Sequence, residues 1–201
     1  MSFDVCPMVL QGPKVRLEPL HPDHADELYR IGGETQDWLY MPRAELSSLE
    51  DTQHWIAQAQ TLAAQGEHIS FAIRDLNSGR LAGSSRYLSI RPPHRSLEIG
   101  YTWLGKEFQR SHVNSATKLC LLNHAFDTLG AVRVELKCDS RNLRSQQAIS
   151  RLGATREGLF RKHMFVRDNY LRDTVYFSII AEEWPAIRDR LESTMKHHET
   201  R

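Results

Sequence analysis

One continuous run, from Leu97 to Leu129, constrains the fold more than any other part of the chain. It opens with an alternating strand pattern at Leu97–Leu104, continues through a polar loop, and ends in a helical pattern at Val113–Leu129 that stops at Gly130. A helix that follows a strand and a loop presents unpaired amides and the positive end of its dipole. This order is typical of an anion site.

The rest of the chain alternates strand and helix patterns. Ser48 with Asp51 makes a capping-box pattern ahead of a helix that ends at Gly66, and Leu76–Gly79 suits a tight turn between two strands. Strands are predicted at Val15–Leu20, Ile69–Asp75, Arg80–Ile90, Leu97–Leu104, Val132–Cys138, Ala154–Val166 and Leu171–Ile180, the last two joined by a turn at Asp168-Asn169. Further helices are predicted at Pro22–Ile31, Asn142–Leu152 and Glu182–Leu191, and Gly32–Leu46 is expected to be a loop or short helical turns. This order predicts an α/β fold with a mixed sheet.

Length and composition favour one globular domain. The 201 residues suit a single domain, with a core at about 15–191 and a polar tail at 192–201. Hydrophobic residues make up 40% and charged residues 25%, which argues against disorder or a fibrous repeat. The net charge of +1 predicts no generally basic or acidic partner.

The cysteines and the apolar pattern bear on location. Cys6, Cys120 and Cys138 lack metal-ligand or CxxC spacing, so we expect free thiols in a reducing compartment. No stretch approaches the roughly 18 apolar residues of a membrane span, and the first residues do not read as a leader. We therefore interpret the chain as cytoplasmic, with no membrane partner.

Three segments resemble one known family, the GCN5-related N-acetyltransferase (GNAT) superfamily. They are Leu97–Leu104 followed by Gln109, Asp139–Ile149 followed by Leu152-Gly153-Ala154, and Arg172–Ser178 followed by Glu183-Trp184-Pro185. The last segment is similar to the end of the ribosomal-protein N-terminal acetyltransferase branch. The resemblance covers about Val15 to Leu191.

The resemblance implies a mostly antiparallel sheet, flanked by helices and splayed where acetyl-CoA binds. The splayed strands would be Leu97–Leu104 and Val132–Cys138, with the pantetheine between them. Backbone amides around Trp103 and Leu104 would bond the pantetheine and the carbonyl oxygen that gains negative charge. The alternative is plain sheet core.

By the same resemblance, the cofactor diphosphate would be held by the loop Gln109-Arg110-Ser111-His112-Val113-Asn114. The loop departs from the family's glycine pattern, because His112 and Asn114 occupy the two glycine positions. We expect His112 in a conformation that glycine adopts freely, at a strain of roughly 1 kcal/mol. The alternatives are a direct His112–phosphate contact and an ordinary solvated loop.

Three further residues are candidates for the chemistry. The resemblance implies that Asn142 contacts pantetheine and that Ser145 protonates the leaving thiolate, although Asn142 also suits a helix N-cap and Ser145 a helix surface. Glu98 is the best general-base candidate, against a cross-strand ion pair with an arginine. Asp173 and Tyr176 are weaker candidates.

The predicted reaction is direct acetyl transfer from acetyl-CoA to a primary amine, which is either a protein N-terminal α-amine or a small molecule. A non-catalytic acyl-CoA-binding module is the alternative. The ten histidines show no ligand spacing, so no metal is expected. Residues 141–172 carry eight Lys or Arg residues against two acidic residues, and we interpret this surplus as a solvated face. Because no RNA-binding motif accompanies it, we expect no nucleic-acid partner. The sequence leaves a homodimer open.

Overall fold

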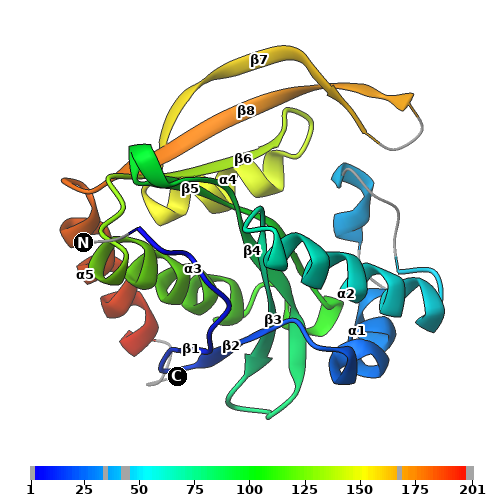
Figure 1. Cartoon of the computed structure of the whole chain (residues 1–201). Coiled ribbons are helices and arrows are strands. Elements are labelled where there is room, and N and C mark those ends of the chain that lie inside the picture. The colour runs from blue at the N-terminus through cyan, green and yellow to red at the C-terminus, as the bar shows by residue number, and fades with distance from the viewer. Residues whose placement is uncertain (1–2, 34–35, 42–45, 167–168, 198–201) are drawn as a thin grey trace.

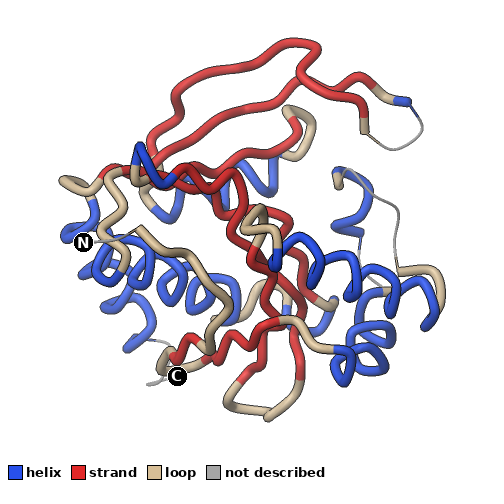
Figure 2. Tube along the Cα trace, viewed as in Figure 1, coloured by secondary structure: helices blue, strands red, loops and turns tan. Residues whose placement is uncertain are grey.

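The computed structural model describes residues 3–33, 36–41, 46–166 and 169–197. Within them an eight-stranded sheet has the order β1-β2-β3-β4-β5-β6-β8-β7 (Figures 1 and 2). The strands are β1 (Leu10–Gln11), β2 (Val15–Pro19), β3 (Ile69–Asp75), β4 (Leu81–Arg91), β5 (Ser96–Leu104), β6 (Arg133–Asp139), β7 (Thr155–Phe165) and β8 (Leu171–Ile180); the helices are α1 (Ala25–Gly32), α2 (Leu49–Ala64), α3 (Val113–Asn123), α4 (Leu143–Leu152) and α5 (Trp184–His197). The expected α/β fold with a mostly antiparallel sheet is confirmed.

Helices cover both faces of the sheet, as the alternation in β3 shows. Phe71 and Ile73 pack in the cluster that includes α3 and α5, whereas Ala72 packs with α1 and α2. Successive side chains of a strand point to opposite faces, so β3 is buried on both sides. Figure 1 shows the two groups of helices on either side of the central strands, with the β7–β8 hairpin extending beyond them.

The sheet opens between β5 and β6. Their parallel pairing covers only Ser96–Glu98 opposite Arg133–Glu135, although β5 runs on to Leu104 and β6 to Asp139. The register between β4 and β5 also shifts, and Tyr101 sits at this bulge with a positive φ of 50°. The two strands therefore diverge from an apex at Glu98.

Several predicted element bounds need correction. Residues 22–31 divide into a 3₁₀ turn at Pro22–His24 and α1. The 3₁₀ turn at Gln36–Tyr40, by contrast, agrees with the short helical turns expected between Gly32 and Leu46. The helix predicted to reach Leu129 ends in a π turn at His124–Thr128, and α5 extends through His197 into the expected polar tail. Asp168 of the predicted hairpin turn lies outside the described residues.

The predicted cap of α2 is nearly right. The Asp51 amide donates to Ser48 Oγ over 3.0 Å, as expected of an N-cap serine. The Asp51 carboxylate accepts from the Ser47 amide at 3.1 Å, one residue earlier than a capping box requires. Within the described part of the chain, no helix combines the length and apolar character needed to cross a membrane.

Candidate active site

Glu98 lies at the apex of the splay, at the last position where β5 and β6 pair. Its side chain is 2% exposed, and its carboxylate accepts from Lys137 Nζ at 2.8 Å and from Ser89 Oγ at 3.3 Å. A Cβ added at Gly100 would stand 3.0 Å from Oε1, so this glycine leaves the carboxylate uncrowded. The alternative ion pair of Glu98 is therefore present, with a lysine in place of the expected arginine.

Burial sets the proton affinity of Glu98. Loss of solvent raises the pKa of its carboxyl above the ordinary value, and the Lys137 ammonium opposes this rise. A carboxylate with a raised pKa is a stronger base than one in water. The arrangement can therefore hold an ionised carboxylate at the apex that accepts a proton from a nearby group.

Asn142 and Ser145 lie beside the other splayed strand. Asn142 caps α4, because its Oδ1 accepts the Ser145 amide at 3.0 Å. The Ser145 hydroxyl hydrogen-bonds the thiol of Cys138 on β6. Burial raises the pKa of this thiol to about 11 and the Ser145 hydrogen bond opposes the rise, so Cys138 is a protonated, structural thiol at neutral pH.

A polar bridge joins β5 to α4 at the open end of the splay. Gln109 donates from Nε2 to the carbonyl oxygen of Leu104 at 3.0 Å and accepts at Oε1 from Arg144 at 3.0 Å. The side chains of Trp103 and Leu104 are buried in core clusters on opposite faces. Any contribution of these two residues to a ligand site must therefore come from their backbone.

The loop before α3 adopts a different conformation from the expected one. His112 has φ −65° and ψ −21°, which is ordinary right-handed geometry, so the expected strain at His112 is wrong. The left-handed residue is Arg110, with φ 60°. His112 is held in place because its carbonyl accepts from the Ala116 amide at 2.9 Å and its Nε2 lies 2.8 Å from Asp75 Oδ1.

The start of α3 retains amides that can bind an anion. Ser111 Oγ accepts the Val113 amide at 3.2 Å, and Ala116 bonds back to His112. Helix geometry leaves the Asn114 and Ser115 amides without an intrahelical acceptor. His112 therefore serves this end of α3 by fastening it to β3 through Asp75.

Removing the His112 side chain is expected to weaken anion binding at α3. His112→Gly loses the bond to Asp75 and frees the backbone, so we expect acetyl-CoA to bind about 3- to 10-fold more weakly. His112→Gln, whose amide can still reach Asp75, is the matched control and should bind nearly as the wild type does. Calorimetric titration measures both, and tighter binding by His112→Gly would contradict the buttressing role.

Two features of the site could not be read from sequence patterns. Lys118 on α3 is 6% exposed and donates to Thr102 Oγ1, which in turn lies 2.8 Å from Ser85 Oγ. Arg86 stacks its guanidinium 4.4 Å over the Tyr101 ring. The only sequence signal for the first feature is that Lys118 stands among apolar positions of a predicted helix. The partners themselves could not be predicted, because Lys118, Thr102 and Ser85 belong to three separate elements, α3, β5 and β4.

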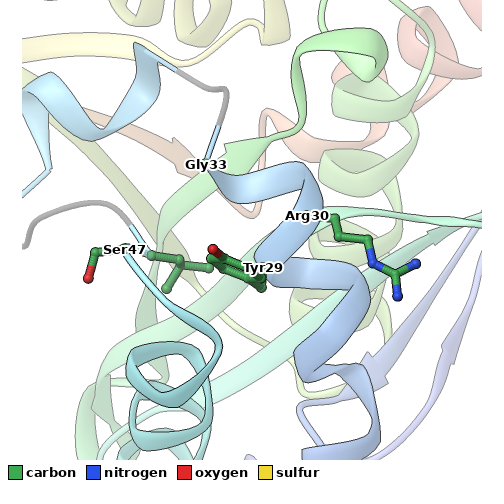
Figure 3. Close-up of a pocket in the computed structure, with 5 residues that line it drawn as sticks. Tyr29, Arg30, Gly33 and Ser47 are labelled. Atoms are coloured by element: carbon green, nitrogen blue, oxygen red, sulfur yellow. The ribbon is translucent and has the colours of Figure 1, made fainter.

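A separate depression lies between α1 and the segment before α2. Figure 3 shows its lining residues, and its volume is about 460 Å³. Tyr29, Arg30, Gly33, Leu46 and Ser47 line it, and none of these was a predicted site residue. Among the described residues, no three His, Cys, Asp or Glu side chains gather into a group able to hold a metal ion.

Comparison with known proteins places this geometry in a family. The model of the acetyltransferase (GNAT) domain matches residues 14–155. The chain is 31% identical over 109 residues to the "Putative ribosomal N-acetyltransferase YdaF" of Bacillus subtilis, covering 54% of this chain and 58% of that protein's length. A crystal structure of a GCN5-related N-acetyltransferase from Brucella melitensis superposes with a TM-score of 0.85 at 29% identity, covering 92% of this chain and 84% of the other.

A second similar structure was solved with ligands. It is the Microcin C7 self immunity acetyltransferase MccE in complex with acetyl-CoA and AMP. Its TM-score is 0.75 at 22% identity, covering 84% of this chain and 93% of the other, and this likeness is one of fold.

Proposed function

The chain belongs to the GNAT family of acetyltransferases, and on that premise we propose that it transfers the acetyl group of acetyl-CoA directly to a primary amine. The observation that carries the proposal is the splay itself. The strands β5 and β6 part immediately beyond Glu98, beside a helix end suited to phosphates. A long, phosphate-bearing thioester fits such a site with its phosphates at the helix end and its acyl end inside the splay.

The described residues have complementary roles in the proposed reaction. Glu98 accepts the proton of the acceptor ammonium, directly or through water. The free amine attacks the thioester carbonyl carbon, the C–N bond forms, and the C–S bond breaks. Backbone amides around Trp103 and Leu104 stabilise the oxyanion, and Ser145 is the candidate proton donor to the departing CoA thiolate.

The first acceptor class to test is the α-amine of a protein N-terminus. The Bacillus subtilis relative is named a putative ribosomal N-acetyltransferase, which supports a ribosomal acceptor, and the N-terminal α-amine comes from the family resemblance of residues 172–185. A small-molecule amine is the second class. Measuring CoA release with peptides that have a free N-terminus, and with small amines, separates the two classes. If neither class causes CoA release, catalysis is refuted. Binding of acetyl-CoA without any release would favour a non-catalytic acyl-CoA-binding module.

Acetyl-CoA should stabilise the folded chain. A ligand that binds only the native state at 100 times its Kd adds about 2.7 kcal/mol to the free energy of unfolding, which for a chain of this size raises Tm by roughly 5–10 °C. Thermal melts at increasing acetyl-CoA concentration measure the rise, which should grow with the logarithm of concentration. An unchanged Tm at millimolar acetyl-CoA would contradict the proposed function at its first step.

A further inference from the structure

Arg172 is a buried arginine near the start of β8. It is 4% exposed, and no carboxylate of the described residues forms an ion pair with it. Its Nε donates to Thr174 Oγ1 at 2.9 Å and its Nη1 lies 3.4 Å from the carbonyl oxygen of Tyr40. A guanidinium remains charged at neutral pH, and burial without an anion is unfavourable. The two neutral contacts hold the group in place without neutralising it.

The neighbouring carboxylate does not serve Arg172. Asp139 on β6 is fully buried, and its two oxygens accept from Arg141 Nε at 2.9 Å and Nη2 at 2.7 Å. Arg172 influences Asp139 only through space, where its charge helps to lower the pKa of that carboxyl after the contacts of Arg141. Within the described residues, the guanidinium of Arg172 therefore has no carboxylate in direct contact.

Arg172 lies beside the carboxyl end of β6, on the open side of the splay. Thr174 of β8 pairs with Asp139, and Val175 pairs with Cys138, the residue that Ser145 contacts. Residues i, i+2 and i+4 of a strand share a face, so Arg172, Thr174 and Tyr176 lie together on the face opposite the α3 core. This is also the face of Glu98 and Lys137, which are joined by their ion pair.

The side chains on this face form a continuous polar path. Thr174 Oγ1 lies 3.0 Å from His163 Nδ1, His163 Nε2 lies 3.4 Å from the Tyr176 hydroxyl, and Lys137 Nζ lies 5.8 Å over the Tyr176 ring. The path runs from Arg172 towards the apex at Glu98. An acceptor lying along it would meet Glu98 at one end and Arg172 at the other.

The two imidazoles on this side report a positive environment. The pKa of His163 is lowered, first by burial and then by the charges of Lys137 and Arg172. The pKa of His68 is lowered by burial and then by the Arg86 guanidinium. Lys137 is offset by its ion pair with Glu98, so the charge of Arg172 makes its end of this face favourable to a negative ligand.

We infer that the acceptor amine carries an anionic group, a carboxylate or a phosphate, that ion-pairs with Arg172 while its amine faces Glu98. This inference rests on the proposed acetyl transfer and names the chemical class of its acceptor. A guanidinium binds either anion through two N–H donors, so both groups belong to the same chemistry. One hydrogen bond to a charged group contributes an amount of binding free energy that raises the affinity for the anionic acceptor by about 10- to 100-fold over a neutral analogue.

The test uses acceptors in matched pairs that differ in one charge. Peptide amides that begin with Glu or Gln, and with Asp or Asn, give the carboxylate arm at a protein-like N-terminus. Phosphoethanolamine with ethanolamine, and 4-aminobutyrate with its amide, give small-molecule arms for phosphate and carboxylate. We expect kcat/KM of the wild type to favour the anionic member of at least one pair by about 10-fold or more.

Variants then assign the preference to Arg172. Arg172→Gln should reduce it to about 2-fold or less while leaving the Kd for acetyl-CoA unchanged, and Arg172→Lys should retain part of it because the charge is kept. Arg161→Gln, an exposed position on β7, is the matched control and should keep the full preference. Equal use of both members of every pair, or a preference that survives Arg172→Gln, would overturn the inference.

A binding measurement separates this inference from the proposed function. Calorimetry of the same amines with the CoA complex does not depend on turnover. Binding of an anionic amine that Arg172→Gln abolishes, without acetylation, would support the inference and refute acetyl transfer to that class. Acetylation of neutral amines with no binding of any anionic member would refute the inference and leave acetyl transfer intact, and an absence of both binding and turnover would refute both.

Discussion

Replacing Glu98 with glutamine is expected to lower kcat by roughly 10²–10⁴-fold, the range by which a positioned general base accelerates a reaction. The glutamine keeps the shape of the side chain but cannot take a proton. Acetyl-CoA affinity should change little, because the proposed phosphate site lies at the other end of the splay. Steady-state kinetics and calorimetry measure the two quantities separately.

The pH profile adds a second readout for Glu98. Burial raises the pKa of this carboxyl, so wild-type activity should fall as pH drops through a value above that of an ordinary glutamate. Glu98→Gln should lack this acidic limb. Lys137→Met removes the opposing ammonium and should move the limb to higher pH.

A matched control tests the position rather than the charge. Glu135 of β6 pairs with Glu98 of β5. Its carboxylate accepts hydrogen bonds from Arg91 at 3.1 Å and from Arg133 at 3.2 Å, so Glu135→Gln changes a neighbouring carboxylate that is not the proposed base. It should change kcat by no more than a few fold. A Glu98→Gln enzyme with wild-type kcat would show that another group, or water acting on a neutral amine, removes the proton.

Replacing Lys118 with methionine is expected to stabilise the fold at and below neutral pH. Burial lowers the pKa of this ammonium from 10.5 to about 7. Below pH 7 the lysine is charged in both states, and the folded state carries the full cost of burying that charge. At 1.36 kcal/mol per pKa unit this cost is about 3–5 kcal/mol, so Lys118→Met should raise Tm by roughly 10 °C at pH 6.

The advantage of Lys118→Met should shrink as pH rises. Between pH 7 and 10.5 the unfolded lysine binds a proton that the folded one does not, so wild-type stability from this group increases with pH. Above 10.5 the lysine is neutral in both states and the cost disappears. Chemical denaturation at pH 6, 8 and 9.5 measures the trend, with exposed Lys106→Met as a control expected within about 0.5 kcal/mol of the wild type. A difference that does not vary with pH would contradict the burial argument.

The sequence was sufficient to predict the element order, because local patterns carry it. The Ser48 cap, the Asn77–Gly79 turn and the Gly153 stop of α4 are each set by a few adjacent residues, and the structure has all three. It missed β1, which gains its strand geometry only by pairing with β2. It also missed the π turn at His124–Thr128, since the apolar spacing continues through it.

The candidate site shows where local patterns lose their power. Glu98, Asn142 and Ser145 could be singled out because each stands in a short motif beside a strand or a helix end. The ion pair between Glu98 and Lys137, the His112–Asp75 bond and the contact of Arg172 with the Tyr40 carbonyl join residues distant in sequence. His112 illustrates the consequence. Its place in the loop pattern predicts a strained backbone, whereas in the structure its backbone is right-handed and its ring contacts Asp75, 37 residues earlier in the chain.

By itself, therefore, the sequence determined which segments become strands and helices, in what order, and which family the chain resembles. Hydrophobic periodicity, caps and turn residues involve residues that are close together in the sequence, so they can be recognised without the tertiary structure. Only the tertiary structure decided where β5 and β6 part, which charges are buried and which partner each one finds. Register and burial depend on contacts between distant segments, so the raised proton affinity of Glu98 and the burial of Arg172 exist only in the folded chain.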